Sequence, residues 1–164
     1  MIGEAESIKE AVIQVAKLMV VSAKTAPKAR GVDNIVTLIL DKKEELEALA
    51  SKMEELAPRY GDFFRRDAGN VRNSDAVVLI GCKIVEFGLE KPGKWKVDRD
   101  LVNSLVNLGI ALGSAVKTAS IHNVDNRIMF SAGVAAQELG LLNADVVYAI
   151  PLSARGKNIY FDRR

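Results

Sequence analysis

The residues best suited to chemistry in this sequence lie in a short basic connector, TAPKARGVDN, at residues 25–34. It contains two cations, a glycine and two further polar side chains, namely Lys28, Arg30, Gly31, Asp33 and Asn34. Lysine and arginine pair with phosphate oxygens, and a glycine turn leaves backbone N–H groups free to donate to the same anion. The connector therefore indicates a site for a phosphorylated small molecule. The alternative is a solvated basic loop, because exposed cations are common on protein surfaces.

A second basic segment consists of Arg155, Gly156 and Lys157 and follows the last predicted strand. Ligands of layered α/β domains bind at loops that leave the ends of strands. We predict that Arg155 and Lys157 neutralise phosphate together with the cations of the connector. Asp33 and Asn34 are then left to hydrogen-bond polar ligand atoms or to hold the turn.

The tripeptide VDN occurs twice, at residues 32–34 and again at 124–126, where Arg127 follows it. In one interpretation Asp125 or Asn126 caps the next helix and Arg127 is an exposed residue of its first turn. In the other, Arg127 pairs with Asp33 or with a ligand, so that one site is closed from two sides.

Recognised catalytic constellations are missing from the sequence, which has no HExxH, GxSxG, Walker or GxGxxG motif. His122, the only histidine, is a general base in the functional interpretation and a partly exposed hydrogen-bonding residue in the other. Cys82, the only cysteine, ends an apolar run and is expected to be a packing residue. Nothing in the spacing of potential ligands predicts a metal site.

Hydrophobic periodicity predicts the first two helices. Apolar residues recur at three- and four-residue steps after Ser7, and this helix must end before Pro27 because the residue preceding proline avoids helical angles. A second helix is predicted after Asp41 and Glu44, which have capping-box spacing.

Short apolar runs rich in β-branched residues predict three buried strands, at residues 35–40, 76–82 and 145–152. Residues 58–73 and 83–97 show no helical periodicity, and we expect them to be irregular. The succession of elements predicts a single α/β (α+β layered) domain over residues 1–164, with a central sheet flanked by helices.

A third helix is predicted after Asp98, and its segment 101–117 is apolar on nearly every side. Gly109 and Gly113 lie one turn apart in it, although glycine costs a helix about 1 kcal/mol relative to alanine. Such a helix is buried in the middle of a domain or between two subunits. A fourth helix is predicted at residues 127–139 and ends at a glycine.

Composition limits the class of protein. The chain has 164 residues, 49% of them hydrophobic and 27% charged, which is ordinary for a globular domain. Its net charge of +2 gives no global attraction to nucleic acid or to an anionic membrane. With one cysteine, no apparent signal peptide and no apolar run of roughly 18 residues, we expect a soluble cytoplasmic protein.

Four long blocks resemble an uncharacterised prokaryotic family whose members are described as containing a ferredoxin domain. They are SAKTAPKARGVDNIVTLIL, FFRRDAGNVRNSDAVVLIGCK, LGIALGSAVKTASIHNVDNRIMFSAGVAAQELGLLNAD and IPLSARGKNIYFDR, in this order and over nearly the whole chain. Members of that family commonly carry a cysteine cluster between the second strand and the third helix. Here the corresponding region, KIVEFGLEKPGKWKVDRDLVNS, has no cysteine, so we expect no iron–sulfur cluster.

The succession of elements is also similar, more remotely, to the flavin-dependent nitroreductases. That resemblance implies a homodimer joined through helix 101–117, with flavin mononucleotide (FMN) at the subunit interface. It places the connector beside the flavin ring and ribityl chain, and Arg155 or Lys157 near the phosphate. Nitroreductases usually carry two arginines at the start of the first helix, where this chain has ESIKEAV, and their loop has Ser, Asn and Gln where this one has Lys28, Gly31 and Asp33.

Two functions remain open at the level of sequence. The first is an FMN-binding, NAD(P)H-dependent oxidoreductase, a class in which the flavin performs the hydride chemistry and the protein positions it. The second is a non-enzymatic binding or regulatory protein that keeps the scaffold without a redox cofactor.

Overall fold

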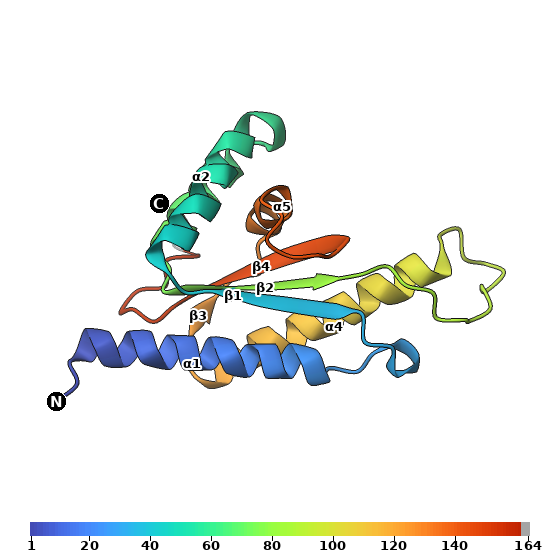
Figure 1. Ribbon diagram of the computed structural model, residues 1–164, viewed down its shortest axis with the longest axis horizontal. Coiled ribbons are helices and arrows are strands. Elements are labelled where there is room, and N and C mark those ends of the chain that lie inside the picture. Colours follow the sequence, from blue (N-terminus) through green and yellow to red (C-terminus); the bar gives the residue numbers. More distant parts are fainter. Residues whose placement is uncertain (162–164) are drawn as a thin grey trace.

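The computed structural model describes residues 1–161 and contains a four-stranded sheet between two layers of helices (Figure 1). The strands are β1 (Ile35–Leu40), β2 (Ala76–Cys82), β3 (Asp125–Asn126) and β4 (Val146–Ser153). Their spatial order is β1-β2-β4-β3, and each pair of neighbours is antiparallel. The predicted layered fold is therefore confirmed, with helices on both faces of the sheet.

The helices α1 (Glu4–Thr25) and α4 (Arg99–Ile121) cover one face of the sheet. The other face carries α2 (Lys43–Tyr60), α3 (Phe63–Arg72) and α5 (Phe130–Glu138). Each layer forms its own hydrophobic core against the sheet. Every residue of β2 is buried because both cores meet on that strand, which explains its unbroken apolar sequence.

The ends of the long helices follow local sequence signals. The last residue of α1 is Thr25, and Ala26 before Pro27 has extended angles, as predicted. The side chain of Asp98 accepts a hydrogen bond from the backbone N–H of Leu101 at 2.7 Å and so caps α4, also as predicted. The first helix begins at Glu4, although its apolar periodicity starts only after Ser7.

The prediction for the start of α2 was wrong by one residue. Glu45, not Glu44, reaches back to the helix start, where its Oε2 accepts hydrogen bonds from the backbone N–H groups of Asp41 and Lys42, each at 3.2 Å. The helix accordingly begins at Lys43.

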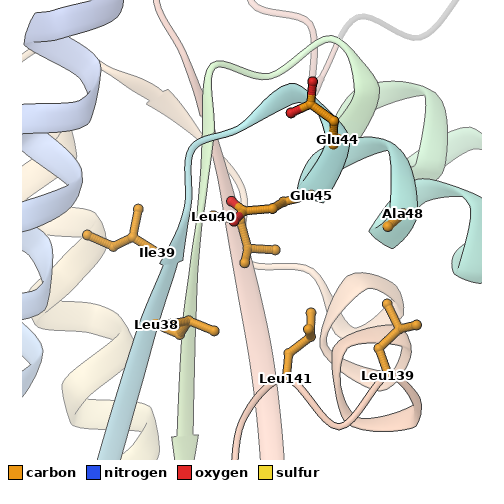
Figure 2. Close-up of a pocket in the computed structure, with 8 residues that line it drawn as sticks. All are labelled: Leu38, Ile39, Leu40, Glu44, Glu45, Ala48, Leu139 and Leu141. Carbon is orange, nitrogen blue, oxygen red and sulfur yellow. The ribbon is translucent and has the colours of Figure 1, made fainter.

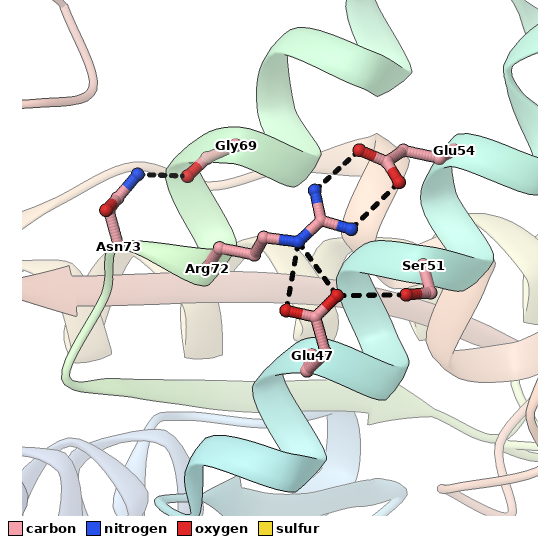
Figure 3. Close-up of polar contacts among 6 residues, drawn as sticks. All are labelled: Glu47, Ser51, Glu54, Gly69, Arg72 and Asn73. Atoms are coloured by element: carbon pink, nitrogen blue, oxygen red, sulfur yellow. Dashed lines mark hydrogen bonds and ion pairs between the residues drawn. The ribbon is translucent and has the colours of Figure 1, made fainter.

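The prediction that residues 58–73 are irregular was also wrong. The second helix continues through Pro58 to Tyr60, and α3 follows after a turn at Gly61. Arg72 joins the two helices: its Nε donates to Glu47 at 2.9 Å, and its terminal nitrogens donate to Glu54 at 2.5 and 2.8 Å (Figure 3). Cross-helix pairing of this kind leaves no periodic trace in the sequence of α3 itself.

The prediction that Asp125 or Asn126 caps the fourth helix was wrong. Both residues belong to β3, which pairs with the end of β4, and α5 begins later than predicted, at Phe130. Gly133 lets α5 lie close to β4, because a Cβ atom there would be 2.1 Å from the carbonyl oxygen of Val147. At the far end, Gly140 has a φ of +65° and follows the helix where the sequence indicates a left-handed residue.

The strand β1 forms an edge of the sheet, and the outward-facing backbone groups of its first residue, Ile35, are occupied. The backbone N–H of Ile35 donates to Asp33 Oδ1 at 3.3 Å, and the carbonyl oxygen of Ile35 accepts from Lys24 Nζ at 3.4 Å. The carbonyl oxygen of Asn34 accepts from the backbone N–H of Lys83, the residue after β2, so the alternation of an antiparallel ladder directs the backbone groups of Thr37 and Ile39 outward.

The helix α4 is apolar on both sides but buried on only one. Its inner side chains pack on α1 and the sheet, whereas Leu105, Val106 and Ile110 are exposed. By length and composition α4 is apolar enough to cross a membrane, with a mean hydropathy of 1.3, contrary to our expectation that no segment would be. The core helix of a layered domain meets the same criteria, and 39% of the apolar window of α4 is buried inside the domain.

Candidate functional site

The connector between α1 and β1 begins with a helix cap made by Lys28. Its ammonium group donates to the carbonyl oxygens of Lys24 at 2.6 Å and Ala26 at 2.8 Å, with a longer contact to Ala23 at 3.5 Å. These are among the carbonyl groups that the end of α1 leaves without helical partners. The contacts direct Lys28 toward its own backbone, so its charge stabilises the end of α1.

Arg30 and Gly31 form the turn of the connector, within the short 3-10 helix η1 (Ala29–Gly31). Both have left-handed angles, with φ of 51° at Arg30 and 68° at Gly31. The Nη1 of Arg30 donates to the carbonyl oxygens of Phe87 at 2.9 Å and Gly88 at 3.3 Å. Arg30 thus binds the connector to the long loop that follows β2.

Asp33 forms an ion pair with Lys24 of α1 and also accepts the hydrogen bond from the backbone of Ile35. Partial burial opposes ionisation of this carboxyl, but the hydrogen bonds from Lys24 and from Ile35 outweigh it and lower the pKa of Asp33. Asp33 is therefore a carboxylate at neutral pH and closes the connector onto the helix before it.

Asn34 is the buried member of the predicted set. Its Nδ2 donates to the carbonyl oxygen of Lys83 at 2.8 Å, and its Oδ1 accepts from Asn107 Nδ2 of α4 at 2.9 Å. Asn107 in turn accepts from the backbone N–H of Ala29 at 2.9 Å. The two asparagines fix the connector against α4, a role that matches the prediction that Asn34 holds the turn.

A polar hollow of about 340 Å³ lies beside the connector, between α1 and α4. It is lined by hydroxyl groups, one ammonium group and a few apolar atoms: Ser22, Thr25, Pro27, Ser114, Lys117, Thr118 and Ile121, with Ala26. Ser22 and Thr118 share a hydrogen bond of 2.6 Å across it. Ser22, Ser114, Lys117 and Thr118 were not among the predicted site residues, although the sequence LGSAVKT contains the small polar residues that α4 contributes to the hollow.

The remaining predicted site residues lie at the other end of the sheet. The register pairs Ile35 and Val146 with Cys82 at the connector end, whereas Arg155 lies beyond the far end of β4 and its Nη2 donates to the carbonyl oxygen of Asn73 at 2.7 Å. Lys157 follows in the same loop. With a rise of ~3.3 Å per strand residue, the two ends are at least ~20 Å apart.

Arg127 also lies away from the connector. Its Nη1 donates to the carbonyl oxygen of Tyr160 at 3.2 Å, and its guanidinium group lies 5.3 Å from the ring centre of Phe161. The ion pair of Asp33 is with Lys24, so Arg127 and Asp33 do not close a site within one chain. Residues 162–164, at the end of the chain, lie outside the described residues.

The two lone reactive side chains of the sequence have ordinary surroundings. His122 is exposed at the end of α4. Cys82 is buried, and burial, with a smaller contribution from Asp145, raises the pKa of its thiol to about 11. A thiol with that pKa is protonated at neutral pH and is a poor nucleophile, which confirms the packing role predicted for Cys82. Within residues 1–161, no group of three or more His, Cys, Asp and Glu side chains is arranged to hold a metal ion.

An apolar cavity of about 420 Å³ lies on the opposite face of the sheet, away from the predicted site residues (Figure 2). Leu38, Leu40, Leu139 and Leu141 line it, and the carboxylates of Glu44 and Glu45 lie at one end, with Ile39 and Ala48 completing the wall. It has no cation for a phosphate, so the hollow beside the connector remains the candidate site.

The fold is shared with structures of nitroreductases. A nitroreductase family protein from Clostridium novyi NT superposes with a TM-score of 0.61 and 15% identity, over 92% of this chain and 77% of that one. The NADPH:FMN oxidoreductase from Vibrio harveyi, complexed with NAD+, gives a TM-score of 0.59 and 13% identity, over 92% of this chain and 63% of its own length. This chain spans only 58% and 60% of the length of two further oxidoreductase structures. At such identities the similarity shows the nitroreductase fold alone.

Sequence comparison shows the family. An uncharacterized protein from Archaeoglobus fulgidus is 42% identical over 180 aligned residues, which cover 99% of this chain and 97% of that protein. The family model described as "uncharacterized protein containing a ferredoxin domain" (DUF2148) matches residues 101–163. The chain belongs to this family of ferredoxin-domain-containing proteins and has the nitroreductase fold.

Proposed function

We propose that this protein is a homodimeric oxidoreductase that binds FMN between two copies of the chain and takes its electrons from NAD(P)H. The observation that carries the proposal is the outer face of α4, which is apolar, contains two glycines and is not covered by any other element of the described chain. The fold supports the choice of cofactor, because the similar Vibrio harveyi enzyme is an NADPH:FMN oxidoreductase.

The outer face of α4 has the composition of a helix-packing surface. Leu105, Val106 and Ile110 are exposed there, and a Cβ atom built on Gly109 or Gly113 would meet no atom of this chain within 4 Å. Glycine within a helix destabilises it, so two glycines on an open face need a reason outside the chain. Close approach of a second helix supplies that reason, since small residues let two backbones pack together.

The hollow beside the connector has groups that suit the polar part of FMN. Ser22, Thr25, Ser114 and Thr118 offer hydroxyl oxygens that can hydrogen-bond the hydroxyl groups of a ribityl chain, and Lys117 offers a cation for the phosphate. The exposed apolar side chains of α4 in a second copy are suited to cover a planar ring. Bound there, the flavin supplies the hydride-transfer chemistry, while these residues bind it, orient it and exclude water.

A dimer also gives a role to the second basic segment. Arg155 and Lys157 lie at the end of the sheet away from the connector, so one site that uses both segments must take them from two copies of the chain. We propose that these cations contribute to the phosphate site in this way.

A binding or regulatory protein without flavin is the second candidate. One observation favours it: the polar side chains of the connector are engaged within the chain, Lys28 with the end of α1, Arg30 with the loop after β2 and Asp33 with Lys24. Such a connector is held in shape without a ligand.

The absorbance spectrum of the purified protein, recorded before and after incubation with FMN, separates the two functions. We expect flavin bands after gel filtration, about one flavin per chain, and a dimeric mass by light scattering. A colourless protein that leaves the fluorescence of added FMN unquenched would support the second candidate. The double variant S114A/K117A should reduce FMN affinity, whereas S51A/K52A in α2, which changes the same residue types away from the hollow, should not.

A further inference from the structure

Residues 88–97, GLEKPGKWKV, form a loop that stands clear of the helical layers beyond the start of α4 (Figure 1). We call it the lysine–tryptophan loop. All ten of its residues are exposed, including Leu89, Trp95 and Val97, which are apolar. Three large apolar side chains on one exposed loop leave a surface that a partner would bury.

The charge of the loop is unbalanced. The loop contains one carboxylate, Glu90, and three lysines, Lys91, Lys94 and Lys96. None of these lysines has an ion pair or a hydrogen bond among residues 1–161. The loop therefore presents a tryptophan flanked by unpaired cations.

The base of the loop is fixed to the body of the protein. The backbone N–H of Phe87 donates to Asp100 Oδ1 at 3.0 Å, and that of Val85 donates to Ser104 Oγ at 3.3 Å. Arg30 of the connector holds the carbonyl oxygens of Phe87 and Gly88. A turn at the tip is closed by the backbone N–H of Trp95, which donates to the carbonyl oxygen of Pro92 at 3.0 Å. A partner bound to the loop would thus be attached to the connector, whose first residues, Thr25, Ala26 and Pro27, line the candidate hollow.

We infer that the lysine–tryptophan loop is the docking site for a small acidic electron-carrier protein. Carboxylates of the carrier pair with the three lysines, and Trp95 enters an apolar hollow between them. Tryptophan surrounded by charge is the composition of an interface hot spot with a polar rim. The choice of an electron carrier rests on the proposed function.

The size of the loop agrees with a short-lived complex. Standard interfaces use about 20–30 residues from each partner, whereas electron-transfer complexes are smaller. Unpaired cations suit such complexes because they steer an oppositely charged partner and raise the rate of association. An anionic membrane is a poorer fit, since stable attachment to a bilayer needs a lipid chain or an inserted helix in addition to a few basic residues.

The inference is tested by the fluorescence of Trp95, which is the only tryptophan of the chain. The probe is an acidic [2Fe–2S] ferredoxin, added to the full-length protein at about 20 mM NaCl, where electrostatic attraction is weakly screened. We expect a saturable change in Trp95 emission and an affinity that falls about tenfold at about 200 mM NaCl. The variant K94E/K96E should bind at least about tenfold more weakly.

The matched control is K9E/K43E, which makes the same change in net charge at two exposed lysines outside the loop. It should bind the ferredoxin within about twofold of the unchanged protein. Equal binding by K94E/K96E and the unchanged protein, equal losses in both variants, or no response of Trp95 to ferredoxin would each overturn the inference. A response of Trp95 to phosphatidylglycerol vesicles without a response to ferredoxin would overturn it in favour of a membrane surface.

Flavin binding is measured separately, by absorbance, in the same preparations. A colourless protein whose Trp95 reports ferredoxin binding would end the proposed FMN function and leave the docking site in place. A yellow protein without that response would do the reverse.

Discussion

Asn34 and Asn107 share a buried hydrogen bond of 2.9 Å that links the connector before β1 to the middle of α4. Each asparagine also bonds a backbone group of a neighbouring segment, Asn34 the carbonyl oxygen of Lys83 and Asn107 the N–H of Ala29. The connector, the end of β2 and α4 thus converge on two amide side chains. Any ligand held by the connector depends on this arrangement.

Replacing Asn107 with alanine should destabilise the protein by about 1–3 kcal/mol, because Asn34 Oδ1 and the Ala29 N–H lose their partner. Urea unfolding gives the free energy. Asn103→Ala, one turn earlier, removes only a hydrogen bond to Arg99 within the helix and should cost less than about 0.5 kcal/mol. Similar costs for the two variants would contradict a special role for the asparagine pair.

Gly113→Ala should leave the folded monomer intact and weaken the dimer. A Cβ atom at Gly113 meets nothing in the same chain, and alanine favours helix by about 1 kcal/mol. If a second α4 packs there, the added methyl group separates the two backbones. Sedimentation at several protein concentrations should show a larger dissociation constant, and a dimer unchanged by both Gly113→Ala and Ile110→Lys would place the interface elsewhere.

Gly133→Ala adds the same methyl group at a glycine that is closely packed, on the other face of the sheet. Here the new Cβ would lie 2.1 Å from the carbonyl oxygen of Val147, so α5 must move away from β4. We expect a loss of more than about 2 kcal/mol in the free energy of unfolding, at the upper end of the overpacking range. A thermal melt of this variant that matches the unchanged protein would show that the contact between α5 and β4 is looser than the structure indicates.

The contribution of Arg72 to stability should depend on pH. Hydrogen bonds from Arg72 lower the pKa of both Glu47 and Glu54 in the folded protein. Carboxyl groups with a lowered folded pKa stabilise the protein above their unfolded value of about 4.5, and this contribution is lost as the pH falls through the folded pKa. The difference in unfolding free energy between the unchanged protein and Arg72→Gln should therefore be constant near neutral pH and shrink below about pH 4.5.

Arg65→Gln is the control for that measurement, because Arg65 pairs with the exposed Asp62 within a single turn and its charge is the smallest of the influences on Glu54. It should change stability little at any pH. A pH-independent difference for Arg72→Gln would show that the arginine acts by packing and not by its ion pairs.

The thiol of Cys82 should react with Ellman's reagent only after unfolding. It is fully buried, and its pKa of about 11 leaves it protonated at pH 8. A Cys82→Ala, Ser51→Cys variant, with its thiol on the exposed side of α2, should react at once. Rapid reaction of the native protein would show that the end of β2 opens readily.

Those parts of the fold that rest on local patterns were predictable from the sequence. The strands β1 and β2 have the predicted bounds because short β-branched runs flanked by polar residues have few other structures available. Proline at 27 and aspartate at 98 fixed two helix ends in the same way. The sequence of α3 misled because Arg65, Arg66 and Asp67 interrupt its apolar face, although Asp67 is buried and accepts a hydrogen bond from Ser131.

The candidate site was less predictable, because the sequence shows which residues are cationic but not where their charges go. Lys28 was expected to face a ligand, and it caps α1. Arg155 and the connector were expected to share a site, but strand pairing places them at opposite ends of one chain. Such outcomes depend on contacts between residues far apart in the sequence, and no local pattern encodes them.

The open edge of β1 affects the tendency of the protein to aggregate at high concentration. Asp33, Lys24 and Glu45 already hold the outward backbone groups at Ile35 and Asp41, so a foreign strand would find free partners only at Thr37 and Ile39. Two rungs are too few to template a growing fibril. Charge reversal at Asp33 or Glu45 would lengthen the accessible ladder, and turbidity of concentrated samples would then rise without any loss of native structure.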